Sequence, residues 1–427
     1  MAKLNTRNRN KNKYDKEGKQ KAPNWEYRFE AAKIEGKRKS ISKAGFRTKK
    51  EAEIAGAKAM AEYDNAGLKF EPTEMSYSDF LDFWFDNYVL TSCKYNTQTA
   101  YRKIIDNHLK PALGSYRLRA LTPVMLQDYI NQKSTTGLSR AHMKNILCVI
   151  TGSLKYAVVP SKLLTSSPAE YIKLPKNLAA RRDTNRTVVS VEDFGRMLER
   201  FKKGNPFRYA LLIGFYTGLR IGEVHALTWD DIDLKEGVIS VSKTAYKRGL
   251  TDDKRTVWCL GSPKTNSSTR RIKIGETLVR ELAEYRRIQR ENRLQYGEFY
   301  TLLYAREEQD SQGQTVHRLL EVSSAVPVSL PAVDLIMRKE NGEYSSTDSF
   351  KYASRVIHYE MGVDFNFHSL RHTHATMLIE NGVSPKAVQA RLGHDRIETT
   401  LQTYVHNTEA MEDAAVDIFE TAVSTTF

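Results

Sequence analysis

The sequence predicts a multidomain protein with a small α+β domain, an all-α domain, and a mixed, mainly α domain that carries a small antiparallel sheet. Its length of 427 residues exceeds what one ordinary core holds. Strand-like alternation near the N-terminus gives way to helical periodicity after Pro72, and mixed patterns resume beyond a polar stretch that starts near Leu174. The expected boundaries are a flexible basic arm at 1–22, domains at 23–70, 74–172 and 188–408, a linker at 173–187 and a tail helix at 409–427.

Charge is distributed unevenly along the chain. The formal net charge is +15, and residues 1–50 hold 17 Lys and Arg against 5 Asp and Glu, a surplus of 12. Such an asymmetry favours a polyanionic partner, with nucleic acid first, although basic termini are also often plain solvated tails.

Cysteine usage and hydropathy indicate the compartment. Three scattered cysteines, Cys93, Cys148 and Cys259, fit a reducing environment without a disulfide framework or a zinc cluster. The N-terminus has no apolar segment typical of a signal peptide, and no apolar run is long enough to span a membrane. We therefore expect a cytoplasmic protein without a membrane partner.

The first domain should begin at Trp25, where apolar and polar residues alternate as in a strand with one buried face. A second, more basic strand is expected over Arg38–Phe46, and Thr48 with Glu51 forms a capping box that opens a helix. A basic sheet backed by one helix can enter a DNA groove, or it can be a small module with a solvated basic face. The candidate DNA contacts are Arg28, Arg38 and Lys39.

The second domain reads as four helices. Thr122 with Pro123 opens the third and Ser139 the fourth, while the second should stop before Pro111. Their apolar stripes indicate a helical core. Exposed basic residues on these helices suit phosphate contacts, although any solvated helix carries such residues; the candidates are Lys94, Arg102, Lys103, Arg140 and Lys144.

The third domain begins with a helix that is apolar on all sides, over Pro206–Tyr216, which leads directly into the turn Thr217–Glu223. This turn places Arg220 and Glu223 at the edge of a buried helix. Strands are expected over residues 238–244 and 256–260, with a returning strand over 270–274, which would put Lys264 near the tip of a hairpin. Residues 304–324 are polar and aperiodic, as in a long surface loop or a short hairpin.

The most informative stretch is residues 365–404. His368 and Arg371 are three residues apart and share a helix face, and that helix ends at Gly382. Ser384 and Pro385 start the next helix, which ends at Gly393 and directs His394 back toward the first. A short segment then leads to Tyr404.

These residue types suit chemistry on a phosphodiester. Two arginines can bind the nonbridging oxygens and stabilise the charge of a pentavalent transition state. A lysine can protonate the leaving oxygen, histidines exchange protons near neutral pH, and a tyrosine can attack. Each has a structural alternative: Arg220 can simply pair with Glu223, and Tyr404 can be an ordinary half-buried tyrosine. His368 and His372 have metal-ligand spacing but lack the carboxylate of a His-Glu-x-x-His motif, so we expect no metal.

Taken together and in this order, the segments TGLRIGE, HSLRH and LGH, with Lys264 and Tyr404, resemble the tyrosine recombinase, or phage integrase, family. The all-α domain resembles that family's core-binding domain. The first 70 residues resemble the arm-binding domain of integrases from conjugative transposons and temperate phages, a module that chromosome-dimer recombinases of the family lack.

The resemblance implies a tyrosine recombinase fold and a site-specific integrase that cuts and rejoins DNA without metal, ATP or another cofactor. Tyr404 would form a 3′-phosphotyrosyl bond and release a 5′-hydroxyl. Arg220, Arg371 and His394 would bind the phosphate, and Glu223 would support Arg220. The other expected catalytic residues are Lys264 as the general acid and His368 in proton transfer.

The resemblance also implies partners. They are double-stranded DNA at attachment and arm sites and three further copies in a homotetramer, with an excisionase and a DNA-bending protein as candidate accessory factors. The chain would act in a bacterial cytoplasm, associated with the nucleoid when bound to DNA. Its acidic tail helix would dock on a neighbouring protomer or pack on its own domain. The alternatives are a type IB topoisomerase-like enzyme and a catalytically idle DNA-binding regulator.

Overall fold

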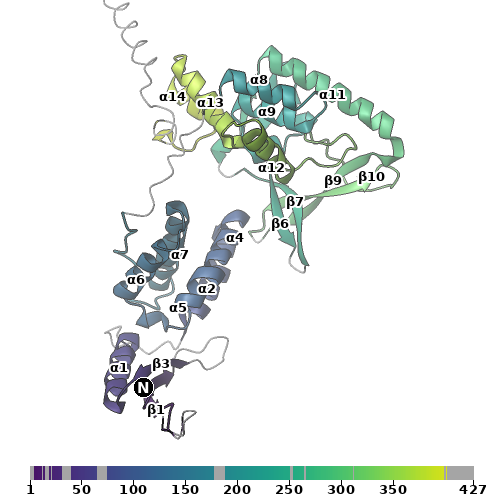
Figure 1. Cartoon of the computed structure of the whole chain (residues 1–427). Coiled ribbons are helices and arrows are strands. Elements are labelled where there is room, and N and C mark those ends of the chain that lie inside the picture. The colour runs from purple at the N-terminus through teal and green to yellow at the C-terminus, as the bar shows by residue number, and fades with distance from the viewer. Residues whose placement is uncertain are drawn as a thin grey trace, which may run out of the picture. The chain divides into compact units, whose positions relative to one another are not determined.

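The computed structural model describes residues 4–11, 13–14, 19–20, 22–30, 40–64, 75–176, 188–250, 253–263, 266–310, 312–398 and 401 (Figure 1). The chain divides into two compact units, residues 1–182 and 183–427. None of the described helices combines the length and the apolar character that crossing a membrane requires.

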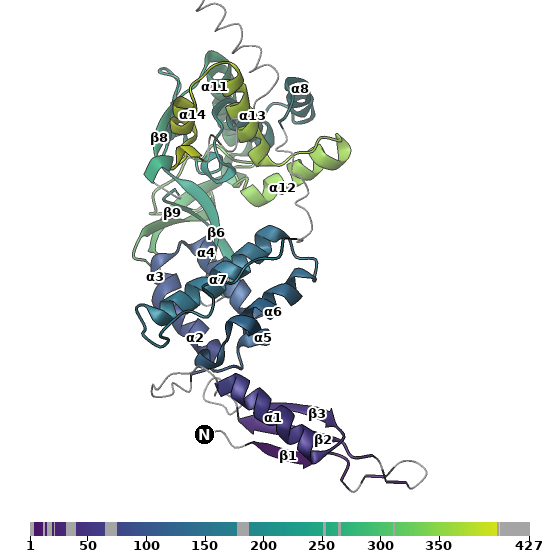
Figure 2. The same cartoon turned by 90° about the vertical axis from the view of Figure 1, so that its left-hand side faces the viewer.

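The first unit begins with a three-stranded antiparallel sheet in the order β1-β2-β3, covered on one face by a helix (Figure 2). The elements are β1 (Asn5–Asn8), β2 (Trp25–Glu30), β3 (Ser40–Phe46) and α1 (Lys49–Asp64). Tyr27 and Phe29 of β2 are buried toward α1. The predicted capping box is confirmed, because the Glu51 backbone N–H donates to Thr48 Oγ1 at 3.2 Å and the Thr48 N–H donates to the Glu51 carboxylate at 3.4 Å.

The expectation of a flexible arm at 1–22, with order beginning at Trp25, is wrong for β1. Residues Asn5–Asn8 pair with β2, with Asn5 opposite Arg28 and Arg7 opposite Glu26. The strand is polar at every position, so it has no apolar alternation to signal it. Its backbone bonds to the edge of β2 and an ion pair from Arg7 to Glu26 stabilise it instead.

The remainder of the first unit is a helical bundle with four continuous helical stretches, as predicted. They are α2, η1 and α3 (Tyr77–Trp84, Phe85–Val89, Leu90–Ser92), then α4, η2 and α5 (Tyr95–Ile104, Ile105–Leu109, Lys110–Leu113), then α6 (Pro123–Ser134) and α7 (Arg140–Val158), with a short turn η3 (Leu118–Ala120) between the second and third. The predicted caps are confirmed: Thr122 accepts from the Met125 N–H and Ser139 from the His142 N–H.

The second helical stretch does not stop before Pro111 but continues through it to Leu113. A π-helical turn, η2, precedes the proline and shifts the hydrogen-bond register of the backbone. Pro111 therefore lies in the first turn of α5, where its missing N–H leaves no helical bond unmade.

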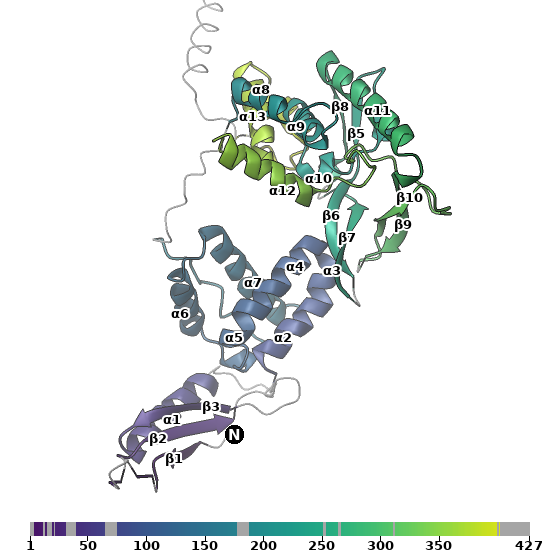
Figure 3. The ribbon, with the colours of Figure 1, turned by 45° about the vertical axis from the view of Figure 1, so that its right-hand side comes forward.

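The second unit is built around α9 (Pro206–Thr217), which is buried nearly all round as predicted. The helices α8 (Val191–Arg200), α11 (Glu276–Tyr296) and α13 (Phe367–Glu380) all pack against α9, and α8 and α9 lie side by side in Figure 3. The other helical segments are α10 (Ile221–Val224), η4 (Trp229–Asp231), η5 (Asn266–Ser268), η6 (Gly297–Phe299), α12 (Thr347–Arg355), η7 (Val356–Glu360) and α14 (Pro385–Leu392).

Two antiparallel sheets complete this unit. One has the order β4-β5-β8 and the other β6-β7-β10-β9. The strands are β4 (Ile232–Asp233), β5 (Val238–Val241), β6 (Thr244–Leu250), β7 (Asp253–Gly261), β8 (Arg270–Lys273), β9 (Thr301–Gln309) and β10 (Thr315–Ser323). Of the two structures considered for residues 304–324, the hairpin is confirmed as β9 and β10, which are longer than expected.

The pairing expected around Lys264 is wrong. The returning strand β8 pairs with β5, whereas β7 pairs with β6 and β10. The single strand expected over 238–244 is likewise split between the two sheets, as β5 and the start of β6. The strands β7 and β8 therefore do not form the two arms of one hairpin, and Lys264 itself lies outside the residues that the structure describes. Alternation identifies a strand but not its partner, and the inserted β6–β7 hairpin separates β5 from β8 in the sequence.

A glycine sets how closely α13 approaches α9. A Cβ atom at Gly214 would lie 2.8 Å from Phe367 Cζ and 2.9 Å from Leu370 Cδ1, whereas a Cβ atom at Gly195 in α8 would meet nothing within 4 Å. Alanine normally stabilises a helix relative to glycine by about 0.5–1 kcal/mol.

We expect Gly195→Ala to show that gain and Gly214→Ala to lower the free energy of unfolding by about 1–3 kcal/mol, because the added methyl group overpacks the contact with α13. Urea unfolding of the full chain measures both. An equal gain in the two variants would contradict the close packing of α9 against α13.

Candidate active site

The turn after α9 positions the first candidate catalytic residue. Gly218 ends the helix in the left-handed conformation, with φ 67°, and Arg220 then caps α10. A Cβ atom at Gly218 would lie 2.6 Å from Leu392 Cδ2 and 3.0 Å from His374 Cδ2. Glycine therefore satisfies both the backbone conformation and the close approach of α14 and α13 to this turn.

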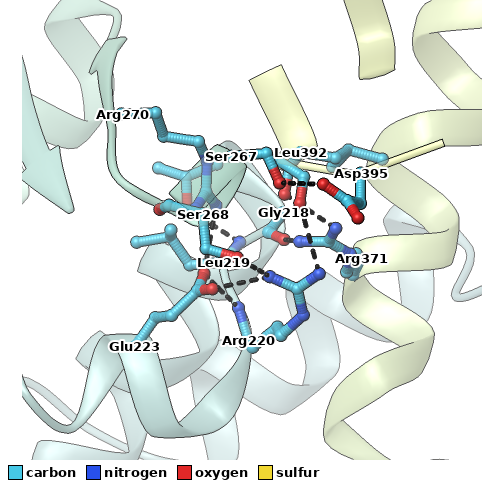
Figure 4. Close-up of polar contacts among 12 residues, drawn as sticks. Gly218, Leu219, Arg220, Glu223, Ser267, Ser268, Arg270, Arg371, Leu392 and Asp395 are labelled. Atoms are coloured by element: carbon cyan, nitrogen blue, oxygen red, sulfur yellow. Dashed lines mark hydrogen bonds and ion pairs between the residues drawn. The ribbon is translucent and has the colours of Figure 1, made fainter. Parts of the chain in front are cut away.

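Arg220, Glu223 and Arg270 form a charged triplet (Figure 4). Glu223 Oε1 accepts from Arg220 Nη1 at 2.7 Å and Glu223 Oε2 from Arg270 Nη2 at 3.0 Å. Glu223 also accepts from the Arg220 backbone N–H at 3.1 Å. The side chain of Arg220 is 34% exposed, against 3% for Glu223 and 7% for Arg270. Of the two guanidinium groups, only that of Arg220 therefore offers a substantial surface to a ligand.

Glu223 is held in its ionised form. Burial by itself would raise the pKa of this carboxyl group, but the charges and hydrogen bonds of Arg270 and Arg220 lower the pKa below its ordinary value. Arg270 was not among the residues that sequence reasoning selected. The sequence gives little reason to select Arg270, because one arginine in a basic strand resembles any solvated cation.

Arg371 of α13 lies beside Arg220 (Figure 4) and is completely buried. Its Nη1 donates to the Gly218 carbonyl at 2.8 Å and its Nη2 to the Leu392 carbonyl at 2.7 Å. These carbonyls lie at the C-terminal ends of α9 and α14, where the helix dipole favours a positive charge. Arg371 thus joins three helices and adds a charge behind Arg220.

His368 and His394 complete the group. The predicted left-handed conformation of Gly393 is confirmed, with φ 67°, and it ends α14 immediately before His394. Burial, followed by the charges of Arg371 and Arg220, lowers the pKa of His368 to about 4 and that of His394 to about 3. His368 itself contributes to the shift at His394. Arg220, His368, Arg371 and His394 are therefore close enough to interact electrostatically, and both imidazoles are neutral at pH 7.

A second network fixes the end of α14. His374 Nδ1 donates to the Phe215 carbonyl at 2.9 Å, and its Nε2 accepts from Arg391 Nε at 3.0 Å. Arg391 also donates to the Tyr216 and Lys273 carbonyls, at 3.2 and 3.1 Å. The ring nitrogens of His374 therefore have structural partners. We expected no metal ligand here, and among the described residues no three His, Cys, Asp or Glu side chains gather as a metal-binding group.

Several predicted site residues lie outside the residues that the structure describes. These are Lys264, Tyr404, Arg38 and Lys39, together with the tail helix expected over 409–427. Their roles remain predictions.

The candidate DNA contacts of the first unit differ in availability. Arg102 forms ion pairs with Asp82 at 2.6 Å and Asp86 at 3.7 Å, and its guanidinium lies 3.7 Å from the centre of the Phe85 ring. Its charge is thus largely engaged within the bundle. The other candidates are exposed, namely Arg28, Lys94, Lys103, Arg140 and Lys144.

A further basic face was missed. On α12 and η7 the exposed residues Tyr352, Arg355 and Tyr359 follow one helix face, beside exposed Lys351. Basic residues interleaved with aromatic ones suit nucleic-acid contact. Tyr352, Arg355 and Tyr359 are three and four positions apart in the sequence, which is the spacing of one helix face. The apolar residues Phe350 and Val356 of the same segment, which are buried, made it resemble an ordinary core-packing helix.

Comparisons with known proteins identify the family of the chain. The family model "Phage integrase family" matches residues 189–411, "Phage integrase, N-terminal SAM-like domain" matches 76–134 and "Arm DNA-binding domain" matches 11–62. A "Tyrosine recombinase XerC-like" protein of Caldanaerobacter subterraneus is 26% identical over 380 residues, covering 87% of this chain and 89% of that protein. The ICEBs1 integrase of Bacillus subtilis is 24% identical over 373 residues, covering 84% and 86%.

Solved structures share the fold. The Tn1549 transposon integrase in complex with transposon right end DNA has a TM-score of 0.61 at 19% identity, covering 81% of this chain and all of that chain. A lambda integrase tetramer bound to a Holliday junction has a TM-score of 0.50 at 15% identity, covering 90% and 94%. Because the first family model spans more than half of the sequence, the chain belongs to the phage integrase family and is a tyrosine-type site-specific DNA recombinase.

Proposed function

We propose that this recombinase integrates and excises a mobile element through a 3′-phosphotyrosyl intermediate on Tyr404. One observation carries the proposal: Arg220, His368, Arg371 and His394, which three separate segments of the chain contribute, are close enough to interact electrostatically. Two cations and two neutral imidazoles suit a phosphodiester, because they supply positive charge and hydrogen-bond donors. The charge of the nearby Glu223 carboxylate is neutralised by its ion pairs with Arg220 and Arg270.

The proposed chemistry assigns each residue a role. The Tyr404 oxygen attacks phosphorus and loses its phenolic proton in a transfer that His368 assists, the bond from phosphorus to the 5′-oxygen breaks, and Lys264 gives that oxygen its proton. Arg220 and His394 bind the nonbridging oxygens, and Arg371 adds its charge from the buried side. His368 assists proton transfer. Glu223 and Arg270 are positioning residues that fix the Arg220 guanidinium. The 5′-hydroxyl of a partner strand reverses the step.

The proposed partner is double-stranded DNA in the cytoplasm, bound at core and arm sites by four copies of the chain. The integrase structures that share this fold support it, since one is in complex with transposon end DNA and another is a tetramer on a Holliday junction. The exposed face of α12 and η7 and the basic first unit are the proposed contacts. An excisionase and a DNA-bending protein remain the proposed accessory factors.

Tyr404→Phe should abolish covalent complex formation while leaving DNA affinity unchanged, because only the attacking oxygen is removed. The measurement is a denaturing gel of full-length protein with nicked duplexes from the element ends, in EDTA and without ATP. Tyr171→Phe, which alters an exposed tyrosine of the helical bundle, is the control and should retain the slow band. A band that persists in Tyr404→Phe would reject the nucleophile, and products showing relaxation without strand exchange would favour a topoisomerase.

Glu223→Gln should lower the free energy of unfolding by about 3 kcal/mol, because it leaves the buried charge of Arg270 without its carboxylate. Cleavage should fall more than DNA binding, since Arg220 also loses its partner. Glu276→Gln, on the exposed first turn of α11, is the matched control and should change neither quantity. Urea unfolding and single-turnover cleavage test this, and wild-type stability in Glu223→Gln would contradict it.

Phosphate binding should be coupled to proton uptake. In the free protein the pKa values of His368 and His394 are lowered to about 4 and about 3, so both are neutral above those values. An anion between them offsets the arginine charges and raises both pKa values, so protons bind together with DNA. The affinity should therefore rise as pH falls from about 6.5 toward 4. Calorimetric titration in buffers of different ionisation enthalpy measures this uptake, and an equal uptake by His368→Gln/His394→Gln would refute the assignment.

A further inference from the structure

A carboxylate lies at the centre of the sheet face that α1 leaves uncovered. Cross-strand pairing puts Arg7, Glu26 and Ala44 in one row on this face, and Asn5, Arg28 and Ser42 in the next. Tyr27 and Phe29 point the other way, into the contact with α1. Glu26 is thus surrounded by polar and basic groups on a surface whose other long side chains are exposed.

Two arginines cover Glu26. Its Oε2 accepts from Arg7 Nε at 3.1 Å and lies 3.7 Å from Arg9 Nε. The side chain of Glu26 is only 8% exposed, whereas those of Arg7 and Arg9 are 65% and 54% exposed. The carboxylate is therefore beneath the two arginines, and the guanidinium groups form the surface above it.

Backbone hydrogen bonds fix the positions of both arginines. Arg7 belongs to β1, and the Arg9 backbone N–H donates to the Asn24 carbonyl at 2.8 Å. Burial would raise the pKa of Glu26, but the hydrogen bonds of Arg7 and Ser42 and the charges of Arg7 and Arg9 lower it below its ordinary value. Glu26 is thus an anion at neutral pH, and it holds Arg7 by a hydrogen bond to Nε and Arg9 by an ion pair on its Nε side.

The way in which the arginines are held affects how they can contact DNA. An arginine bound through Nε keeps its two terminal nitrogens for a ligand, and a guanidinium edge fits the O6 and N7 acceptors of guanine in the major groove. A phosphate would attract any arginine equally, but a carboxylate beneath the face repels phosphates and costs non-specific affinity. The ion pair with Arg7 stabilises β1, and on a DNA-binding surface the same carboxylate also gains a role where arginine orientation matters more than net charge.

We propose that Glu26 is a specificity-determining positioning residue, which holds Arg7 and Arg9 so that the sheet reads guanine bases in the arm site. This inference rests on the proposed function, because it requires that the sheet binds DNA. It assigns readout to two arginines that precede Trp25, and it separates them from phosphate-contacting cations elsewhere on the chain.

The test is selection from a duplex library with randomised base pairs by the full-length protein and its variants. Glu26→Gln keeps the shape of the side chain and removes its charge. Glu26→Gln should reduce discrimination at one or two G·C pairs of the arm-site motif that the wild type selects. The expected reduction is about tenfold or more, which is the discrimination that one bidentate contact provides. Affinity for unrelated DNA should stay equal or rise. Glu30→Gln, on the same strand and face, is the matched control and should select the wild-type motif.

A second variant keeps the inference testable if Glu26→Gln disturbs the sheet. Arg7→Lys retains the charge beside Glu26 but loses the forked edge. It should lose the same G·C preference with an unchanged salt dependence of binding, and its thermal unfolding should match the wild type.

The outcomes separate the two proposals. If the wild type selects a motif and both Glu26→Gln and Arg7→Lys select it with equal discrimination, the inference is overturned while DNA recognition stands. If the wild type selects no motif at all, the proposed DNA recognition fails and the inference fails with it.

Discussion

The second unit depends on one carboxylate, that of Glu223. It is the shared partner of Arg220 and Arg270, and it accepts a backbone N–H at the start of α10. Without it, two guanidinium groups would face each other in a nearly buried place. Arg270 in turn donates to the Arg391 carbonyl at 2.8 Å, so the same carboxylate fixes α10, β8 and the end of α14 together. Arg371 donates hydrogen bonds to carbonyl groups at the ends of α9 and α14 and so holds these two helix ends together. The described part of the site, built around Arg220 and Arg371, is thus held in place by the protein itself, which reduces the reorganisation that phosphate binding would require.

Much of this site was predictable because its parts are local. Arg220 belongs to the predicted turn over Thr217–Glu223, and the Ser384 cap and the Gly393 turn are determined by residues a few positions apart. The charged residues that belong to motifs could therefore be selected from the sequence. Arg270 and Arg391 could not, because their partners are backbone carbonyls and a carboxylate brought close only by the tertiary fold.

The wrong predictions share a physical cause. The strand β1 is polar and is stabilised by pairing with β2, so periodicity does not reveal it. The partner of β8 is β5 because an inserted hairpin occupies β7, and no residue in β8 encodes that choice. The helix through Pro111 continues because a π-helical turn precedes the proline, and a rule about proline alone ends it too early. Hydrogen bonds between distant backbone segments decide the first two, and a local change in the hydrogen-bond register of the helix decides the third, whereas side-chain patterns report mainly on burial.

The most direct test of this account is to map the covalent bond itself. The protein–DNA adduct formed in EDTA would be digested with protease and nuclease, and the peptide that carries the residual nucleotide would be identified by mass spectrometry. The account predicts one modified residue, Tyr404, linked to the 3′-phosphate of the cleaved strand. A nucleotide on any other side chain, or one linked through its 5′-phosphate, would contradict it.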